Sequence, residues 1–251
     1  MTPKVSIKNM RFFYGDREVI HDISMDVPEH EIFSLIGPAG SGITTTLRAI
    51  NRLCDLTPGA RMEGEILIDD KNIRDSDISV TRLRRRVGMV FDVPTPLRMS
   101  IYDNVAYGPR LIGGVSKKSL DETVEKTLRE SALWDDVKDR LSAAALSLSG
   151  GQRQRLCIAR VLALDPEVML LDRPCSGLDP ISTAKIEDSL TALKERITII
   201  LAPHNVQQAR RVSDKVAFLL MGDLIESGTN LDIFLSPADQ RTSDYVTGRF
   251  G

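Results

Sequence analysis

Short apolar runs separated by polar, turn-forming segments dominate the hydrophobic pattern of this chain. Continuous apolar runs, typical of strands buried on both faces of a sheet, occur at Ile32–Ile36, Val168–Asp172, Ile197–Ala202 and Val216–Leu220. Helix-like segments lie between these runs. The pattern therefore predicts an α/β fold with a mostly parallel sheet and helices on both of its faces.

The first part of the chain has a different pattern, which is typical of half-buried strands. Val5–Lys8 alternates between apolar and polar residues, Arg11–Tyr14 is rich in aromatic residues, and Val19–Val27 forms a second ribbon after a glycine turn. A further strand is expected over Glu63–Asp69, followed later by a strand over Val87–Phe91. These segments predict β-structure next to the parallel sheet.

A helix is predicted over Ser119–Trp134, where apolar residues recur at helical spacing. Ser119 is the expected N-cap, and Glu122 is expected to complete a capping box. A second, short helix is expected over Asp135–Leu141. Between Asp92 and Ser119, by contrast, three prolines predict a loop.

Length and composition place these elements in one globular protein. The 251 residues, of which 42% are apolar and 27% charged, are expected to form a single domain over 1–251, with a helical subdomain at approximately 93–147 inserted into the α/β core. The net charge of −2 excludes a bulk electrostatic attraction to nucleic acid. The basic cluster Arg82–Arg86 is expected to form a solvated helix face or to meet an acidic partner.

The cysteines and the chain's apolar segments bear on its cellular compartment. The three cysteines are scattered and odd in number, and they form neither a metal-ligand spacing nor a disulfide framework, which fits a reducing cytosol. The N-terminus lacks the apolar segment of a signal peptide, and no apolar run approaches the ~20 residues that span a bilayer. Any membrane role is therefore expected to be peripheral and to act through a partner.

A glycine-rich segment between the strand Ile32–Ile36 and the helix predicted over Thr45–Leu53 has the spacing of a P-loop. Strand, glycine-rich turn and helix N-terminus together make an anion site of backbone N–H groups. The spacing G-x-x-x-x-G-K-[ST] is met at every position except that of the lysine. The segment consists of Gly37, Pro38, Ala39, Gly40, Ser41, Gly42, Ile43, Thr44 and Thr45. Ile43 takes the lysine position and provides neither a charge nor a donor.

Three other sequence features have chemistry that fits a nucleotide site. Leu148–Gln152 places a serine and two glycines at the start of a helix, which is a second anion-binding shape. Asp172 ends a buried strand, as does the carboxylate of a Walker B magnesium site. His204 follows another buried strand.

In their order and spacing, these motifs resemble those of the nucleotide-binding subunits of ABC transporters. Ser100–Arg110, Asp179–Thr183 and Asp244–Gly251 resemble the phosphate-importer branch more closely. The resemblance implies the ABC ATPase fold: a P-loop NTPase core, an N-terminal antiparallel β subdomain and an inserted α-helical subdomain. It also implies ATP and Mg²⁺ as cofactors, and a pair of ATPase subunits beneath two membrane permease subunits, at the cytoplasmic face of the plasma membrane.

The resemblance also implies a role for each matching residue. Tyr14 would stack on adenine, residues 37–45 would wrap the phosphates, and His204 would contact the γ-phosphate. The residues expected to hold Mg²⁺ are Thr44, Asp92 and Asp172. The residues expected to contact the nucleotide of a second subunit, or to link the two sites, are Ser149, Gly150, Gly151, Gln152 and Asp179.

The sequence departs from the family pattern at Ile43, at Asp92 in place of glutamine, and at Arg173 in place of the catalytic glutamate. Asp92 still offers an oxygen to Mg²⁺. Arg173 cannot accept a proton, so general-base catalysis, which typically contributes ~10²–10⁴ in rate, is lost. Two arrangements are open to Arg173: it replaces the missing cation at the γ-phosphate, or it pairs with Asp92 or Asp172. The second is our expectation.

The leading interpretation is therefore an ABC importer subunit, most simply for inorganic phosphate, whose own hydrolytic site is impaired and whose affinity for ATP and Mg²⁺ is weakened. Either a homodimer or a heterodimer with an intact ATPase fits the motifs. The alternative is a non-hydrolysing regulatory or structural subunit that pairs with an intact ATPase. A soluble ABC protein of translation or DNA repair fits less well, because such proteins usually carry two cassettes or a long coiled-coil insertion.

Overall fold

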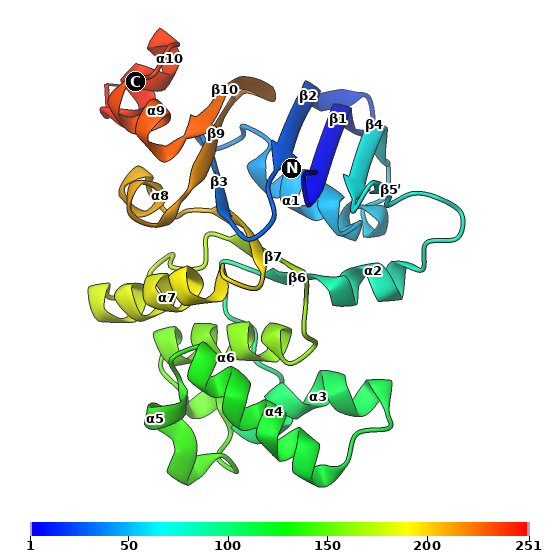
Figure 1. Cartoon of the computed structure of the whole chain (residues 1–251), viewed down its shortest axis with the longest axis vertical. Coiled ribbons are helices and arrows are strands. Elements are labelled where there is room, and N and C mark those ends of the chain that lie inside the picture. The colour runs from blue at the N-terminus through cyan, green and yellow to red at the C-terminus, as the bar shows by residue number, and fades with distance from the viewer. Residues whose placement is uncertain (1, 250–251) are drawn as a thin grey trace.

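The structure is a computed structural model that describes residues 2–249 as two β-sheets with helices between and around them (Figure 1). The first sheet is antiparallel, with four strands in the order β2-β1-β4-β5. Its strands are β1 (Val5–Tyr14), β2 (Arg17–Val27), β4 (Ala60–Ile68) and β5 (Lys71–Asn72). The antiparallel β subdomain expected near the N-terminus is confirmed.

The second sheet has six strands in the order β10-β9-β3-β8-β7-β6, and only the edge strand β10 runs antiparallel to its neighbour. Every residue of β3, β7 and β8 is buried, which explains their continuous apolar runs. The prediction of a mostly parallel sheet is therefore confirmed. Its strands are β3 (Ile32–Ile36), β6 (Val87–Val90), β7 (Val168–Asp172), β8 (Thr198–Ala202), β9 (Lys215–Leu220) and β10 (Asp223–Thr229).

Helix α1 (Ile43–Ile50) lies between the two sheets. Its buried residues Leu47 and Ile50 share one apolar cluster with Phe12 of the first sheet and Leu170 of the second. The helix is short, but both of its apolar sides are covered. Packing on both sides fixes the direction of its axis and therefore the position of its N-terminus.

A helical layer forms the end of the molecule opposite the first sheet (Figure 1). It consists of α3 (Ile101–Ile112), α4 (Lys117–Glu130) and α5 (Trp134–Val137), with 3₁₀ turns at Lys138–Arg140 and Ala145–Ser147. Helix α6 (Gly150–Leu162) joins this layer to the sheet, because Leu156 packs with α3 and α4 while Ile158 packs with β7. Residues 93–147 as a separate subdomain therefore stay a prediction.

Two expectations about this layer are wrong. The N-cap of α4 is Ser116, whose side chain accepts the N–H of Ser119 at 3.2 Å, so the helix begins one turn before the expected N-cap. The expected loop before Ser119 contains α3, which Ser100 caps through the N–H of Asp103. Pro109 lies near the C-terminal end of α3, where its missing N–H removes only one helical hydrogen bond.

The remaining helices cover the faces and the C-terminal edge of the second sheet. Helices α9 and α10 pack beside β9 and β10, an arrangement that the hydrophobic pattern did not predict. None of the helices within residues 2–249 combines the length and the apolar character of a membrane span. These elements are a 3₁₀ turn at Leu53–Leu56, α2 (Val80–Arg86), α7 (Pro180–Leu193), α8 (Val206–Val212), α9 (Asn230–Leu235) and α10 (Gln240–Val246).

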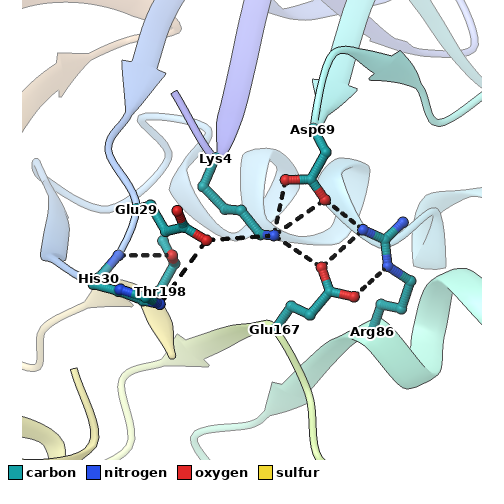
Figure 2. Close-up of polar contacts among 7 residues, drawn as sticks. All are labelled: Lys4, Glu29, His30, Asp69, Arg86, Glu167 and Thr198. Atoms are coloured by element: carbon teal, nitrogen blue, oxygen red, sulfur yellow. Dashed lines mark hydrogen bonds and ion pairs between the residues drawn. The ribbon is translucent and has the colours of Figure 1, made fainter. Parts of the chain in front are cut away.

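A charged network joins the two sheets at the edge away from the glycine-rich loop (Figure 2). Lys4, whose side chain is only 9% exposed, donates to Asp69 at 2.8 Å and to Glu167 at 2.8 Å. Arg86 donates to both carboxylates from the other side, at 2.5 Å and 2.7 Å. The expectation that Arg82–Arg86 is a solvated face is therefore wrong for Arg86, which binds within the protein.

We predict that Glu167→Gln lowers the free energy of unfolding at pH 7 by roughly 1 kcal/mol, a modest value because the carboxylate is 41% exposed to solvent. The hydrogen bond from Arg86, with a further one from Lys4, lowers the pKa of Glu167 from 4.5 to about 2. The carboxylate therefore contributes fully above about pH 4.5, and its contribution is lost as the pH falls toward 2. Urea unfolding at pH 7 and pH 3 measures this, and an unchanged difference at pH 3 would contradict it.

Candidate functional site

The glycine-rich loop, residues 37–45, connects β3 to α1 and is shaped by close backbone approaches. A Cβ on Gly37 would lie 2.1 Å from the carbonyl oxygen of Leu219, and one on Gly42 would lie 3.0 Å from Ile20. Gly42 has φ of 87° and is the N-cap of α1, without any side-chain cap. Only glycine fits these positions without rearrangement of the neighbouring chain.

The start of α1 leaves several hydrogen-bond donors free. The N–H groups of Ile43, Thr44 and Thr45 have no acceptor among the described residues. The hydroxyl of Ser41 is also without a partner there, although Ser41 is only 2% exposed. Uncapped N–H groups at a helix N-terminus, next to a buried hydroxyl without a partner, are the donor set that binds phosphate.

A cavity of about 610 Å³ opens over this loop. It brings together all nine residues of the loop with three of the other predicted site residues: Asp172, Arg173 and His204. Its walls also include residues that sequence reasoning did not single out: Arg17, Val19, Asn205, Val206 and Tyr245. The cavity has the size of a cofactor site.

Asp172 and Thr44 form the part of the cavity that suits a divalent cation. Burial raises the pKa of Asp172, and a hydrogen bond from the Thr44 side chain acts against that rise. A carboxylate and a hydroxyl beside free phosphate-binding donors are the hard oxygen ligands that Mg²⁺ takes together with substrate phosphates. The two residues therefore fit Mg²⁺, and metal-bound phosphate would supply the remaining ligands.

Ile43 occupies the lysine position as a core residue. Its side chain is partly buried and packs against the apolar cluster between the two sheets. It therefore stabilises the start of α1 and adds no charge to the cavity. The backbone donors of the loop are intact, whereas its side-chain cation is absent.

Arg173 does not form the ion pair that we expected. Its side chain is exposed and has no hydrogen bond or ion pair with any other described residue, including Asp92 and Asp172. Asp92 does not line the cavity, and its Oδ1 accepts the N–H of Val93 at 2.8 Å. The expectation of a direct pair with either aspartate is therefore wrong, and only a longer-range attraction links Arg173 to Asp172.

His204 is held by two neighbouring side chains. Its Nδ1 lies 2.8 Å from Oε1 of Gln208, an acceptor, so Nδ1 carries the proton. Nε2 then accepts from the amide of Asn205 at 2.9 Å. Gln208 is fully buried and was missed by sequence reasoning, because a polar residue inside a helix has no motif that marks it.

Tyr14 does not line the cavity wall. Its ring packs on Phe12 with the centroids 5.1 Å apart, and its hydroxyl lies 3.4 Å from that of Thr45. Stacking of Tyr14 on adenine therefore stays a prediction.

Tyr245 of α10 does line the cavity. Its ring stacks on Phe218 with the centroids 4.8 Å apart, and the backbone N–H of Gly37 donates to its hydroxyl. Phe250 and Gly251 of the same terminal motif lie outside the described residues.

The second glycine motif lies outside the cavity, at the N-terminus of α6. Ser149 and Gln152 form a capping box, with each side chain accepting the backbone N–H of the other at 3.2–3.3 Å. Ser182 joins this motif to Asp179. A Cβ on Gly151 would lie 2.2 Å from the Ser182 hydroxyl, which itself donates to Asp179 at 2.6 Å. Within the described chain, the motif therefore serves no part of the loop cavity.

Comparison with known proteins shows the family of this chain. Residues 20–176 match the family described as ABC transporter. The chain belongs to the ABC transporter family. It is 53% identical over 246 residues to phosphate import ATP-binding protein PstB 3 from two strains of Streptococcus pneumoniae, with 98% of each chain covered. The resemblance to the phosphate-importer branch is confirmed.

Solved structures of this family have the same fold. One is cbiO1 from Clostridium perfringens, part of the ABC transporter complex cbiONQ, at a TM-score of 0.83 and 26% identity over 94% of this chain and 92% of that one. Another is a bacterial Atm1-family ABC exporter with ATP bound, at a TM-score of 0.82 and 28% identity over 99% of this chain and 42% of that one. The predicted ABC ATPase fold is therefore confirmed.

We predict that Ile43→Lys strengthens ATP binding about tenfold by adding one charge-assisted contact to phosphate, without restoring turnover. The double variant Ile43→Lys with Arg173→Glu is expected to hydrolyse ATP, because only then are both a cation and a proton acceptor present. Calorimetric titration and phosphate release measure the two effects, with Ile43→Leu as the apolar control. Equal turnover of the single and double variants would refute the role assigned to position 173.

Proposed function

We propose that this chain is the ATP-binding subunit of an importer for inorganic phosphate, and that its own hydrolytic site is impaired. One observation carries the proposal: the phosphate-binding backbone of residues 37–45 is complete, whereas Ile43 and Arg173 take the positions of the cation and the base. The names of the pneumococcal relatives support phosphate as the transported solute.

Binding and hydrolysis place different demands on this site. The free N–H groups of α1 and the Ser41 hydroxyl hold the phosphates, and Thr44 with Asp172 holds Mg²⁺, which neutralises phosphate charge when it is bound. Hydrolysis also needs a group that accepts a proton from water. Arg173 cannot do this, and Asp172 is committed to the metal. The chain therefore binds nucleotide, more weakly than with a loop lysine, and turns it over at background rate.

The motif at Ser149–Gln152 has no substrate within its own chain, so we propose that it acts on the nucleotide of a second ATPase subunit. The backbone N–H groups at the start of α6 and the Ser149 hydroxyl suit the charge of a γ-phosphate. Asp179, which is hydrogen-bonded to Ser182 beside this motif, would link the two sites. In a heterodimer with an intact ATPase, one complete site would form and one impaired site would remain.

A surface for the membrane partner lies on the helical layer. Exposed apolar side chains occur on the segment after β6 and along α3, and exposed apolar residues of this kind suit a protein-binding surface. They are Phe91, Val93, Met99, Tyr107 and Leu111. We propose that one of two permease subunits docks here on each chain of an ATPase pair, which would place the chain at the cytoplasmic face of the plasma membrane. Asp92 lies within this surface.

A second candidate function is that of a non-hydrolysing regulatory or structural subunit paired with an intact ATPase. Within residues 2–249 the Arg173 side chain has no hydrogen bond or ion pair, which favours this function, because that arginine is available to hold a nucleotide that the chain cannot cleave. The two functions differ in whether Ser149–Gln152 is needed for the partner's turnover.

The purified chain alone is predicted to hydrolyse ATP far below about 1 s⁻¹, the low end of typical enzyme rates, because the base is absent and the loop cation is missing. A phosphate-release assay with Mg²⁺ and millimolar ATP measures this. Magnesium-dependent turnover at or above about 1 s⁻¹ would contradict the proposed impairment.

We call the motif Ser149–Gln152 the signature. Its action on the nucleotide of a second subunit (signature donation) is predicted to be visible by complementation between variants of this chain. The variant Ile43→Lys/Arg173→Glu/Ser149→Arg has a restored site but a blocked signature, and the unmodified chain has the reverse. Each alone is expected to be inactive, whereas their mixture hydrolyses ATP, because the unmodified Ser149 completes the restored site. Phosphate release from the mixture measures this.

The matched control places the same charge elsewhere. Ser149→Arg in the otherwise unmodified partner is expected to abolish the mixed activity, whereas Ser119→Arg, on the exposed face of α4, leaves it unchanged. If the mixture with Ser149→Arg stays as active as the mixture with Ser119→Arg, this chain lends no signature, and the regulatory alternative takes precedence.

A further inference from the structure

The cavity over the glycine-rich loop has a positive wall despite the absence of a lysine. Its lining contains two permanent cations, Arg17 and Arg173, and a single carboxylate, Asp172. Both arginine side chains are exposed to solvent in the cavity wall. Neither has a hydrogen bond or an ion pair with another described residue. Apart from a longer-range attraction between Arg173 and the Asp172 carboxylate, which acts against the rise of that carboxyl's pKa, both charges are available to a ligand.

The backbone of Arg173 is held firmly, although its side chain is not. Its N–H donates to the carbonyl of Ala202 at 2.8 Å, and its carbonyl accepts the N–H of Ser176 at 3.0 Å. Its φ is 49°, in the left-handed region that a residue with a side chain seldom adopts. The ends of β7 and β8 thus fix the Cα of Arg173 beside Asp172, and only the side chain remains to be placed by a ligand.

Compared with a P-loop that carries a lysine, the glycine-rich loop keeps its backbone donors and lacks the positive charge. The free N–H groups of Ile43, Thr44 and Thr45, together with the buried Ser41 hydroxyl, make the neutral part of an anion site. A guanidinium binds phosphate through two parallel N–H donors, and it keeps its charge at every physiological pH. It therefore suits the position of the missing lysine electrostatically, from the opposite wall of the cavity.

We propose that Arg173 is the principal cation of this site, that it binds the terminal phosphates of a nucleoside polyphosphate, and that Arg17 adds a second, weaker contact. The choice of a nucleotide as ligand rests on the proposed function. The same substitution that supplies the binding charge removes the proton acceptor. The site consequently retains its nucleotide and does not consume it.

The position of Arg173 also changes the expected role of the metal. A cation fixed next to Asp172 neutralises part of the charge that would attract Mg²⁺, and it neutralises phosphate charge directly. ATP binding by this chain is therefore expected to depend less on Mg²⁺ than binding by the variant Ile43→Lys/Arg173→Glu, in which the carboxylates outnumber the cations at the end of β7.

The test is calorimetric titration of the purified full chain with ATP, tripolyphosphate and adenosine, each with Mg²⁺ and with a chelator. Arg173→Ala is expected to weaken ATP and tripolyphosphate binding about tenfold, the loss of one charge-assisted contact, and to leave adenosine binding unchanged. Arg173→Lys retains most of the affinity, and Arg17→Ala costs a few-fold at most. Arg210→Ala is the matched control, since Arg210 is exposed on α8 and does not line the cavity.

The outcomes separate this inference from the proposed function. The role of Arg173 is refuted if the unmodified chain does not bind ATP, or if the Arg173→Ala variant binds ATP as tightly as the Arg210→Ala variant. The complementation assay tests the proposed function independently of that result. If Arg173→Ala weakens the polyphosphates but complementation fails, the cation assignment stands and signature donation is refuted. Equal weakening of adenosine would also overturn the assignment, because the effect would not then be on phosphate.

Discussion

The position of α1 between the two sheets is the constraint on which the functional site depends. Its apolar residues are covered by both sheets, so the helix cannot rotate or slide without exposing part of the main core. Its uncapped N-terminus is therefore held open at the edge of the parallel sheet. The contact between Gly37 and the carbonyl of Leu219 fixes the other end of the loop against β9. An anion site made of backbone groups needs this rigidity, because backbone donors cannot reach toward a ligand.

The backbone groups that would bind phosphate and the side chains that would take part in hydrolysis belong to different parts of this site. The donors of the loop are backbone groups, which depend on the fold, and no side-chain substitution removes them. The cation position lies at the start of α1, where Ile43 packs against the core, and the base position lies at the end of β7, where the Arg173 side chain is exposed. The structure accordingly keeps the ABC ATPase fold, and the sequence departs from the family pattern at side chains in and around the cavity.

The sequence predicted the parts of the fold that have a strong period or a specific motif. The buried strands were predicted correctly, because residues covered on both faces form continuous apolar runs. Helix α3 was missed because Pro94, Pro96 and Pro109 were interpreted as loop markers, although the first two precede the helix and Pro109 lies near its C-terminal end, where one hydrogen bond is lost. The residues of the loop cavity followed from motifs. The exposed side chain of Arg173 and the place of Tyr245 in the cavity wall depend on how distant segments pack, and the support of His204 by Gln208, four residues away, has no motif that marks it.

The packing of Ile43 bears on how easily a lysine could be accommodated at this position. Because this side chain contributes to the core between the sheets, a lysine in its place would remove apolar contacts and would have to bring an ammonium group out to the cavity. Selection for stability and selection for turnover thus act on this position in opposite directions. A lineage in which Arg173 had already removed the base would gain folding stability from the isoleucine and nothing from the lysine. An evolutionary return to hydrolysis would therefore have to begin at the end of β7, not in the glycine-rich loop.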